Sequence, residues 1–264
     1  MSLATAALLG GVEGLTEFLP VSSTGHLILA GHFLNFTGEK AATFEIFIQL
    51  GAILSVLVAY PQRFLGLLDF KESYGFRGIR GIGRLMLTTL PALVLGFLFH
   101  KKIKEFLFNP LSVAAALILG GIWILIIENR KENSKVQDVD SMTWTQCLGI
   151  GFFQCLAMWP GMSRSASTIL GGMMLGLDRK TAVEYSFFAA VPVLCAATLL
   201  DLVKSLPVLN TADLPFFGVG LIISFITALI VIKIFIGFVS RFKLTGFGWY
   251  RIAAGLAVFL LLHK

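Results

Sequence analysis

Residues 13–26 read EGLTEFLPVSSTGH and place ionisable and hydroxyl side chains inside an otherwise apolar stretch of the chain. Glu13 and Glu17 are four residues apart, so on a helix they lie on the same face. Pro20 ends that helix because its ring lacks the N–H that the next turn needs. A second helix is expected to begin with a Ser or Thr as its N-cap, and His26 falls in its first turn. The segment therefore predicts two short helices that meet at a polar tip.

Carboxylates and a histidine are costly in a hydrocarbon environment, so their presence in this segment indicates a functional site. The alternative is an ordinary helix–loop–helix corner, which would also explain the Pro-Val-Ser-Ser-Thr-Gly run. We favour a functional site because four ionisable or nucleophilic side chains converge in one short segment.

The rest of the chain has the composition of a membrane protein. Of its 264 residues, 56% are hydrophobic and only 14% are charged, whereas soluble domains average about 25% charged residues. Long apolar runs of this kind predict an all-α integral membrane protein. No basic region precedes the first apolar stretch, so no cleavable signal peptide is expected. Three cysteines, Cys147, Cys155 and Cys195, lack ligand spacing and are expected to be core packing.

Hydrophobic runs predict six membrane spans and four shorter helical pieces. The spans are expected at 43–60, 84–100, 112–128, 182–203, 215–238 and 247–263. The shorter pieces, at 3–19, 21–34, 144–159 and 163–177, are at or below the roughly 17–25 residues that a span needs. Each pair of short pieces is therefore predicted to form a re-entrant hairpin with a buried polar tip. Residues 61–82 are expected to be a basic, Gly-rich loop, and KKIKEFLFNP a second loop.

The second half of the chain repeats the first. Aligning Pro160 on Pro20 sets LGIGFFQCLAMWPGMSRSA over LLGGVEGLTEFLPVSSTGH and places Ser163 on Ser23. Each half then has one hairpin and three spans, an odd number, so the halves insert with opposite orientation as an inverted-topology repeat. Within a single membrane domain, 1–264, we expect repeat 1 at 1–128, a polar connection at 129–142 and repeat 2 at 143–264. Chance similarity between apolar segments is the alternative.

The distribution of basic residues orients this topology. The loops at 61–84, 129–142, 178–180 and 238–246 carry twelve Lys or Arg side chains, and the opposite loops carry six. Because the basic side faces the cytoplasm, both termini and the mouth of the first hairpin are expected to face outward, to the periplasmic side. The net charge of +6 is expected to serve orientation and contact with anionic lipid, not nucleic acid.

Residues 160–168, PGMSRSAST, form a second group of polar side chains in an apolar setting. Ser163, Arg164 and Ser165 open a helix after a Pro-Gly break, where free N–H groups and the positive helix end favour an anion. The guanidinium adds a forked donor for phosphate. Ser22 and Thr24 offer hydroxyls for the same anion at the first tip. In the alternative interpretation, Arg164 pairs structurally with a glutamate or extends to the membrane surface.

The two tips together provide the groups that phosphoryl transfer needs. Ser23 could attack, with His26 as general base or as acid to the leaving group, and His26 as the nucleophile is the competing hypothesis. Glu13 and Glu17 would repel a bare diphosphate. They fit if a divalent cation, Mg²⁺ or Ca²⁺, bridges them to it, or if one of them is protonated or orients His26.

Several polar residues outside the tips are further candidates for a functional role. Glu45 and Glu184 occupy similar places in the two halves and are predicted to support the tips through hydrogen bonds, with a purely structural carboxylate as the alternative. Gln49 and Gln154 are similar cases. For Lys233 and Arg251, in the late spans, we favour structural pairing or extension to the membrane surface.

The motifs EGLTEFLPVSSTGH and PGMSRSAST, with FQCLAMWPG before the second, resemble those of the bacterial undecaprenyl-diphosphate phosphatases, the bacitracin-resistance proteins. The resemblance covers nearly the whole chain. It implies an inverted-repeat fold with two re-entrant hairpins. It also implies hydrolysis of undecaprenyl diphosphate in the bacterial plasma (inner) membrane, which recycles the lipid carrier for cell-wall polymers. The essential residues of the family fall on Glu13, Glu17, Ser23, His26 and Arg164, and the resemblance leaves the nucleophile open between Ser23 and His26.

A second function class, a transporter or lipid flippase, also fits inverted repeats with broken helices. The Ser-x-x-His pair after two carboxylates favours the enzyme, because a carrier needs no nucleophile. The expected partners are a polyprenyl diphosphate substrate and membrane lipids, with no nucleic acid, and a homodimer stays open.

Overall fold

The computed structural model describes residues 2–71, 74–107, 109–130, 134–205 and 210–262. Within these ranges the chain is helical, and the only β pairing is an isolated bridge between Val136 and Leu177. The predicted all-α class is therefore confirmed for the described part of the chain.

The described residues of the first half contain six helices. They are α1 (Leu3–Thr16), α2 (Ser23–Phe33), α3 (Glu39–Ala59), α4 (Pro61–Leu67), α5 (Gly78–Leu107) and α6 (Pro110–Glu128). Among the described residues, the second half contains three short 3-10 turns, η1 (Val139–Ser141), η2 (Cys155–Met158) and η4 (Thr211–Asp213). Its α-helices are α7 (Trp144–Gln154), α8 (Arg164–Met174), α9 (Arg179–Ser205), α10 (Leu214–Val239) and α11 (Thr245–Leu262).

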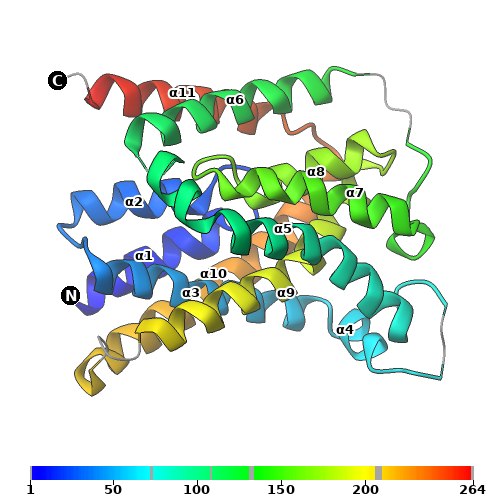
Figure 1. Ribbon diagram of the computed structural model, residues 1–264, viewed down its shortest axis with the longest axis horizontal. Coiled ribbons are helices and arrows are strands. Elements are labelled where there is room, and N and C mark those ends of the chain that lie inside the picture. The colour runs from blue at the N-terminus through cyan, green and yellow to red at the C-terminus, as the bar shows by residue number, and fades with distance from the viewer. Residues whose placement is uncertain (1, 72–73, 108, 131–133, 206–209, 263–264) are drawn as a thin grey trace.

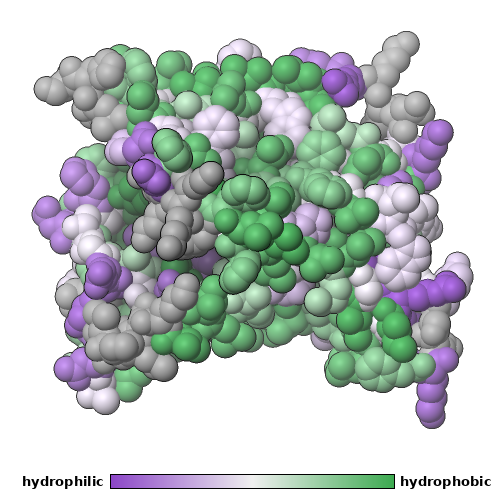
Figure 2. Space-filling model, viewed as in Figure 1, coloured by the Kyte–Doolittle hydropathy of each residue, from purple (hydrophilic) through white to green (hydrophobic). Residues whose placement is uncertain are grey.

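Five described stretches are long and apolar enough to cross a membrane. They are Glu39–Ala59, Gly78–Phe99, Pro110–Glu128, Arg179–Val203 and Thr211–Val239. The sixth predicted span corresponds to α11, whose last predicted residue, 263, lies outside the described residues. Figure 2 shows hydrophobic side chains across the middle of the molecular face, with hydrophilic ones gathered toward its left and right ends. The chain is thus a multi-pass, all-α membrane protein.

Two predicted loops differ from the structure. Residues 61–82 do not begin as a loop: Pro61 stands in the first turn of α4, where its missing N–H has no helical partner to lose. The KKIKEFLFNP segment is not a loop up to Leu107, because α5 continues to that residue. Lys, Glu and Leu are good helix formers, so a helix can continue past the end of its apolar part.

The four short pieces that flank the predicted tips are helices of limited length. Helix α1 has 14 residues, and α2, α7 and α8 have 11 each. At about 1.5 Å per residue none of them crosses a hydrocarbon core of about 30 Å. Each pair is interrupted by a segment that is not α-helical, at residues 17–22 and at residues 155–163, the second of which begins with η2. We call these the two irregular segments.

The two halves of the chain are interleaved. Helix α1 packs on α10, α10 on α3, α3 on α9, and α5 on α7. Helices α6 and α11 lie side by side along one edge (Figure 1). The α1–α10 crossing is close, because Gly10 and Gly14 face the backbone of Gly220 and Ser224 with no room for a Cβ. Small residues at such crossings let helices pack tightly in lipid. This interleaving places the two irregular segments next to each other.

Candidate active site

Each irregular segment ends at a serine with a left-handed backbone. Ser22 (φ 72°) is the N-cap of α2 and Ser163 (φ 73°) is the N-cap of α8. Each hydroxyl accepts a hydrogen bond from the amide three residues on, Gly25 N at 3.4 Å and Ala166 N at 3.2 Å. Such φ values are uncommon for residues other than glycine and are concentrated at functional sites. They mark both helix starts as specialised.

This cap geometry changes the predicted correspondence between the halves. The alignment on the two prolines places Ser163 on Ser23, but the structure gives Ser163 the position of Ser22. The reason is one additional residue after Pro160, where Gly161 adopts a φ of 94°. Consequently Ser23 and Arg164 occupy the same position, the first residue of the helix after the cap.

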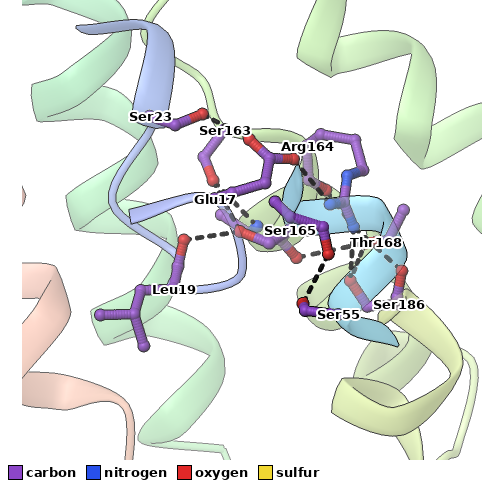
Figure 3. A network of polar contacts seen from close by, with 11 residues as sticks. Glu17, Leu19, Ser23, Ser55, Ser163, Arg164, Ser165, Thr168 and Ser186 are labelled. Carbon is purple, nitrogen blue, oxygen red and sulfur yellow. Dashed lines mark hydrogen bonds and ion pairs between the residues drawn. The ribbon is translucent and has the colours of Figure 1, made fainter. Parts of the chain in front are cut away.

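Glu17 joins these two equivalent residues. The Ser23 hydroxyl donates to Glu17 Oε2 at 2.5 Å, and the Arg164 guanidinium donates from Nη2 to Glu17 Oε1 at 2.8 Å (Figure 3). All three side chains are largely buried, with 5% of Glu17 and 10% of Arg164 exposed. The structure therefore brings together three of the residues that the sequence singles out, from opposite halves of the chain.

Further hydrogen bonds hold α8 against α9, and one holds α8 against the first segment. Arg164 Nη1 donates to the Ser186 carbonyl oxygen at 2.9 Å, and the Ser186 and Thr168 hydroxyls are 2.7 Å apart. The Ser165 hydroxyl donates to the Leu19 carbonyl oxygen at 2.7 Å (Figure 3). Sequence reasoning missed Ser186, because its contact depends on how α9 packs against α8. Ser165 contacts the protein backbone here, although the sequence suggested it for substrate binding.

Glu13 lies one helical turn before Glu17 and is completely buried. Neither of its carboxylate oxygens has a hydrogen-bond partner in the described structure. Buried polar atoms usually have partners, so an orphaned carboxylate calls for a proton or a cation. Among the described residues no group of three His, Cys, Asp or Glu side chains is arranged to hold a metal ion. A cation at Glu13 would take its other ligands from water or phosphate oxygens, as Mg²⁺ commonly does.

His26 is oriented away from the predicted pairing with Ser23. Its Nδ1 lies 2.8 Å from the Ser22 carbonyl oxygen, and because a carbonyl only accepts, Nδ1 carries the hydrogen. Its Nε2 is hydrogen-bonded to the Tyr250 hydroxyl, and the two rings are stacked. In the neutral imidazole Nε2 is then the acceptor. Tyr250 was not predicted from the sequence, since 224 positions separate it from His26.

A cavity of about 1070 Å³ opens beside this network. Its polar end is lined by Glu17, Ser22, Ser23, Thr24, Gln49, Gln154, Ser163 and Arg164. Its other walls are apolar and come mainly from α5 (Ala92, Leu93, Gly96, Phe97, Leu98) and α9 (Val193, Leu194, Ala196, Ala197, Leu200). The cavity therefore offers one polar end and one long apolar region to a ligand.

Two predicted supporting carboxylates lie outside the network. Glu45 is half-buried on α3, one turn before the cavity-lining Gln49. Glu184 is half-buried on α9, where the charges that act on it include Lys180 in the first turn of α9 and Arg63 of α4. The structure thus does not bring Glu184 to the tips.

An apolar-walled cavity that ends at a buried serine, carboxylate and arginine is suited to a molecule with an anionic head and a hydrocarbon tail. In a multi-pass membrane protein, these features define the class of membrane-embedded enzymes that act on lipid phosphates.

Comparison with known proteins identifies the family. Residues 6–257 match the family model of the bacitracin resistance protein BacA, and the chain belongs to this family. A protein named undecaprenyl-diphosphatase from Maridesulfovibrio salexigens is 57% identical over 252 residues, which cover 96% of both chains. One of the same name from Nitratidesulfovibrio vulgaris strain DP4 is 55% identical over 255 residues, 97% of this chain and 96% of the relative. A third, from Nitrosomonas eutropha, is 51% identical over 262 residues, 99% of this chain and 95% of the relative.

Proposed function

We propose that this protein hydrolyses undecaprenyl diphosphate to undecaprenyl phosphate and inorganic phosphate. The reaction recycles the lipid carrier for cell-wall synthesis and confers resistance to bacitracin. Family membership and the names of the relatives support this function. The observation that carries it is the Glu17 carboxylate, which bonds Ser23 on one side and Arg164 on the other at the polar end of the apolar-walled cavity.

The geometry supports a reaction in which Ser23 is the nucleophile. The diphosphate binds at the start of α8, where Arg164 turns from Glu17 to the terminal phosphate. Glu17, which already accepts the Ser23 hydrogen bond, takes the proton as Ser23 Oγ bonds to the terminal phosphorus. The bond from that phosphorus to the bridging oxygen breaks, and undecaprenyl phosphate leaves. Water then hydrolyses the phosphoserine and releases phosphate.

His26 as nucleophile, through a phosphohistidine, is the competing route. It requires His26 Nε2 to leave the Tyr250 hydroxyl and turn toward the cavity, because His26 is not among the residues that line it. We favour Ser23, whose hydroxyl already lies at the cavity beside a carboxylate.

A divalent cation, Mg²⁺ or Ca²⁺, is part of the proposal. Glu13 fits as its ligand because both carboxylate oxygens are buried without a partner. Glu17 would add the oxygen that Arg164 releases, while its other oxygen keeps the hydrogen bond from Ser23. When bound, the cation neutralises charge on the diphosphate and polarises its P–O bonds. Chelation should stop phosphate release, and added Mg²⁺ should restore it. An unchanged rate after exhaustive chelation would remove this role from Glu13 and Glu17.

The finer architecture is proposed as well. The paired short helices, each broken before a serine cap, support two re-entrant hairpins in an inverted-topology repeat with the bounds given above. The excess of basic residues on one side supports an inner-membrane orientation in which the site opens to the periplasm. We propose no nucleic-acid partner, and a homodimer is compatible with this arrangement.

The assay that tests the function measures phosphate release from undecaprenyl diphosphate by pure protein in detergent, with Mg²⁺ or Ca²⁺ present. Detergent removes any transmembrane gradient, so a flippase, the second candidate that interleaved broken helices suggest, would release nothing. Release that depends on Ser23 is expected. Folded protein that leaves the substrate intact would overturn the enzymatic function.

A further inference from the structure

Arg251 on α11 is a buried arginine that the reaction above does not use. Its side chain is 0% exposed, so it neither extends to the membrane surface nor contacts solvent. Its hydrogen-bond partners are five backbone carbonyl oxygens, and the structure shows no ion pair to it within the described residues. An arginine placed this deep in a membrane protein is costly, so its position calls for an explanation.

Three of the five carbonyl groups that bind Arg251 belong to the irregular segments, and both segments contribute. Nη1 donates to the Pro20 oxygen at 3.0 Å, in the first segment. Nη2 donates to the Gly161 and Met162 oxygens, each at 2.9 Å, in the second. Longer contacts, of 3.2 and 3.4 Å, reach Ala116 and Leu117 of α6. One guanidinium therefore joins both segments to the α6–α11 pair.

The positions of these contacts relate directly to the site. Pro20 lies three residues before Ser23, and Gly161 lies three residues before Arg164. Ser23 and Arg164 are the two residues that donate hydrogen bonds to the two carboxylate oxygens of Glu17. Arg251 thus holds each segment at a residue three positions before Ser23 or Arg164.

We propose that Arg251 is a positioning residue that sets the separation of the two irregular segments, and with it the approach of Ser23 to Arg164. This inference rests on the proposed phosphatase function. The carbonyl oxygens at interrupted helices carry partial negative charge. Arg251 neutralises that charge for both segments at once, so neither segment can move away without leaving carbonyls and a cation unpaired in the core.

The surrounding structure is shaped for this guanidinium. Gly120 of α6 lies against Nη2, and a Cβ at that position would overlap the guanidinium. A lysine cannot replace the contacts, since its single nitrogen cannot reach carbonyls that Arg251 contacts from Nε, Nη1 and Nη2.

The test combines two variants with a matched control. Arg251→Lys removes the fork, and Gly120→Ala keeps every charge but displaces the guanidinium while adding a better helix former. The control is Arg84→Lys, because Arg84 is also buried and donates to the carbonyls of Gly75, Val139 and Asp140, without contact to either irregular segment. Each protein is compared for kcat, KM and thermal unfolding in detergent.

A second readout does not depend on catalysis. Spin labels at exposed Ile28 on α2 and Leu156 on η2, in a protein without its three cysteines, report the distance between the helix that follows the first segment and the turn that begins the second. We expect both Arg251 and Gly120 variants to broaden this distance distribution and to lower kcat by about 100-fold, the effect of a misplacement of about 1 Å, with a smaller change in KM. The Arg84 variant should lose stability but keep the narrow distribution and kcat.

The outcomes separate the two proposals. A narrow, wild-type distribution and unchanged kcat in folded Arg251→Lys or Gly120→Ala protein would overturn the positioning role, as would an equal loss of kcat in the Arg84 variant. If Arg251→Lys does not fold, Gly120→Ala decides by the same criteria. If wild-type protein releases no phosphate, the proposed function fails, whereas the distance measurement still tests whether Arg251 sets the separation.

Discussion

The two irregular segments, residues 17–22 and 155–163, use the same backbone geometry to present opposite chemistry. Both end at a serine N-cap with a φ near 70°, and both place the next residue at the polar end of the cavity. In the first segment that residue is the hydroxyl-bearing Ser23, and in the second it is the cationic Arg164. The two halves share the backbone conformation of the N-cap serine, and they differ in the side chain of the residue that follows it.

The helices that precede the two segments differ in the same way. Helix α1 carries Glu13 and leads into Glu17, whereas the proline alignment places Phe153 and Ala157 at the corresponding positions of the second half. The second half therefore provides no carboxylate of its own, and Arg164 bonds the Glu17 of the first. Neither half contains a complete site, which explains why the halves must interleave for the site to form.

The largest effect is expected from removing the hydroxyl of the first segment. Ser23→Ala should lower kcat by about 1,000-fold or more, since the loss of the proposed nucleophile would remove the proposed covalent route. The comparison change just after the second cap, Ser165→Ala, removes hydrogen bonds to the Leu19 carbonyl and the Ser163 hydroxyl and should cost a few-fold. Phosphate release by the two purified variants measures the contrast. Comparable rates would mean that the two segments do not divide the chemistry as proposed.

The next largest effect concerns the cation of the second segment. Arg164→Lys should lower kcat by about 10- to 100-fold, because a lysine cannot contact both the substrate and the Ser186 carbonyl as the fork does. Arg179→Lys is the control: Arg179 binds Glu128 through two nitrogens at 2.8 and 2.7 Å, away from the cavity. Steady-state kinetics on both variants would test the assignment. An Arg164 variant no slower than the Arg179 variant would make Arg164 a structural residue.

A smaller effect is expected at the caps, where the segments are most alike. Ser22→Ala and Ser163→Ala each lose a capping hydrogen bond and keep an unfavourable φ, so each should destabilise the protein by about 1–2 kcal/mol. Glycine at either position accepts the left-handed backbone without strain and should cost only a few tenths of a kcal/mol. Thermal unfolding of the four variants in detergent provides the comparison. Alanine as well tolerated as glycine would show that the caps are not strained.

The sequence was sufficient for much of this arrangement. Pro20 and the hydroxyl run that follows it predict the first interruption, and the repeat predicts the second. Their combination anticipates that Ser23 and Arg164 lie near each other. These inferences succeed because proline, capping serines and short apolar segments act locally, over a few residues.

Other features depend on tertiary packing and could not be read from local patterns. The one-residue shift that pairs Ser163 with Ser22 comes from Gly161, whose left-handed backbone no alignment reveals. His26 turns to Tyr250, and Arg251 turns to five carbonyls, because α11 packs beside both segments. The sequence predicts Glu184 near the tips because its place in the second half is similar to that of Glu45 in the first, but the charges that act on Glu184 come from Lys180 and Arg63, away from the tips.

The smallest effect is expected away from both segments, at the ion pair between Asp140 of η1 and Arg63 of α4. Burial alone would raise the pKa of the Asp140 carboxyl, but hydrogen bonds from Arg63 and the Phe76 amide outweigh it and hold that pKa below its usual value. A lowered pKa contributes stability above the unfolded value of about 3.9, and that stability is lost as the pH falls through the folded pKa. Asp140→Asn should therefore lose less thermal stability than wild type as the pH falls from about 5 to about 3.

At pH 7 the kcat of the Asp140→Asn variant should equal that of wild type, because Asp140 touches neither segment. If stability falls with pH equally in the variant and in wild type, the ion pair with Arg63 does not set the pKa of Asp140. A lowered kcat in the variant would mean that the Asp140–Arg63 region influences the site.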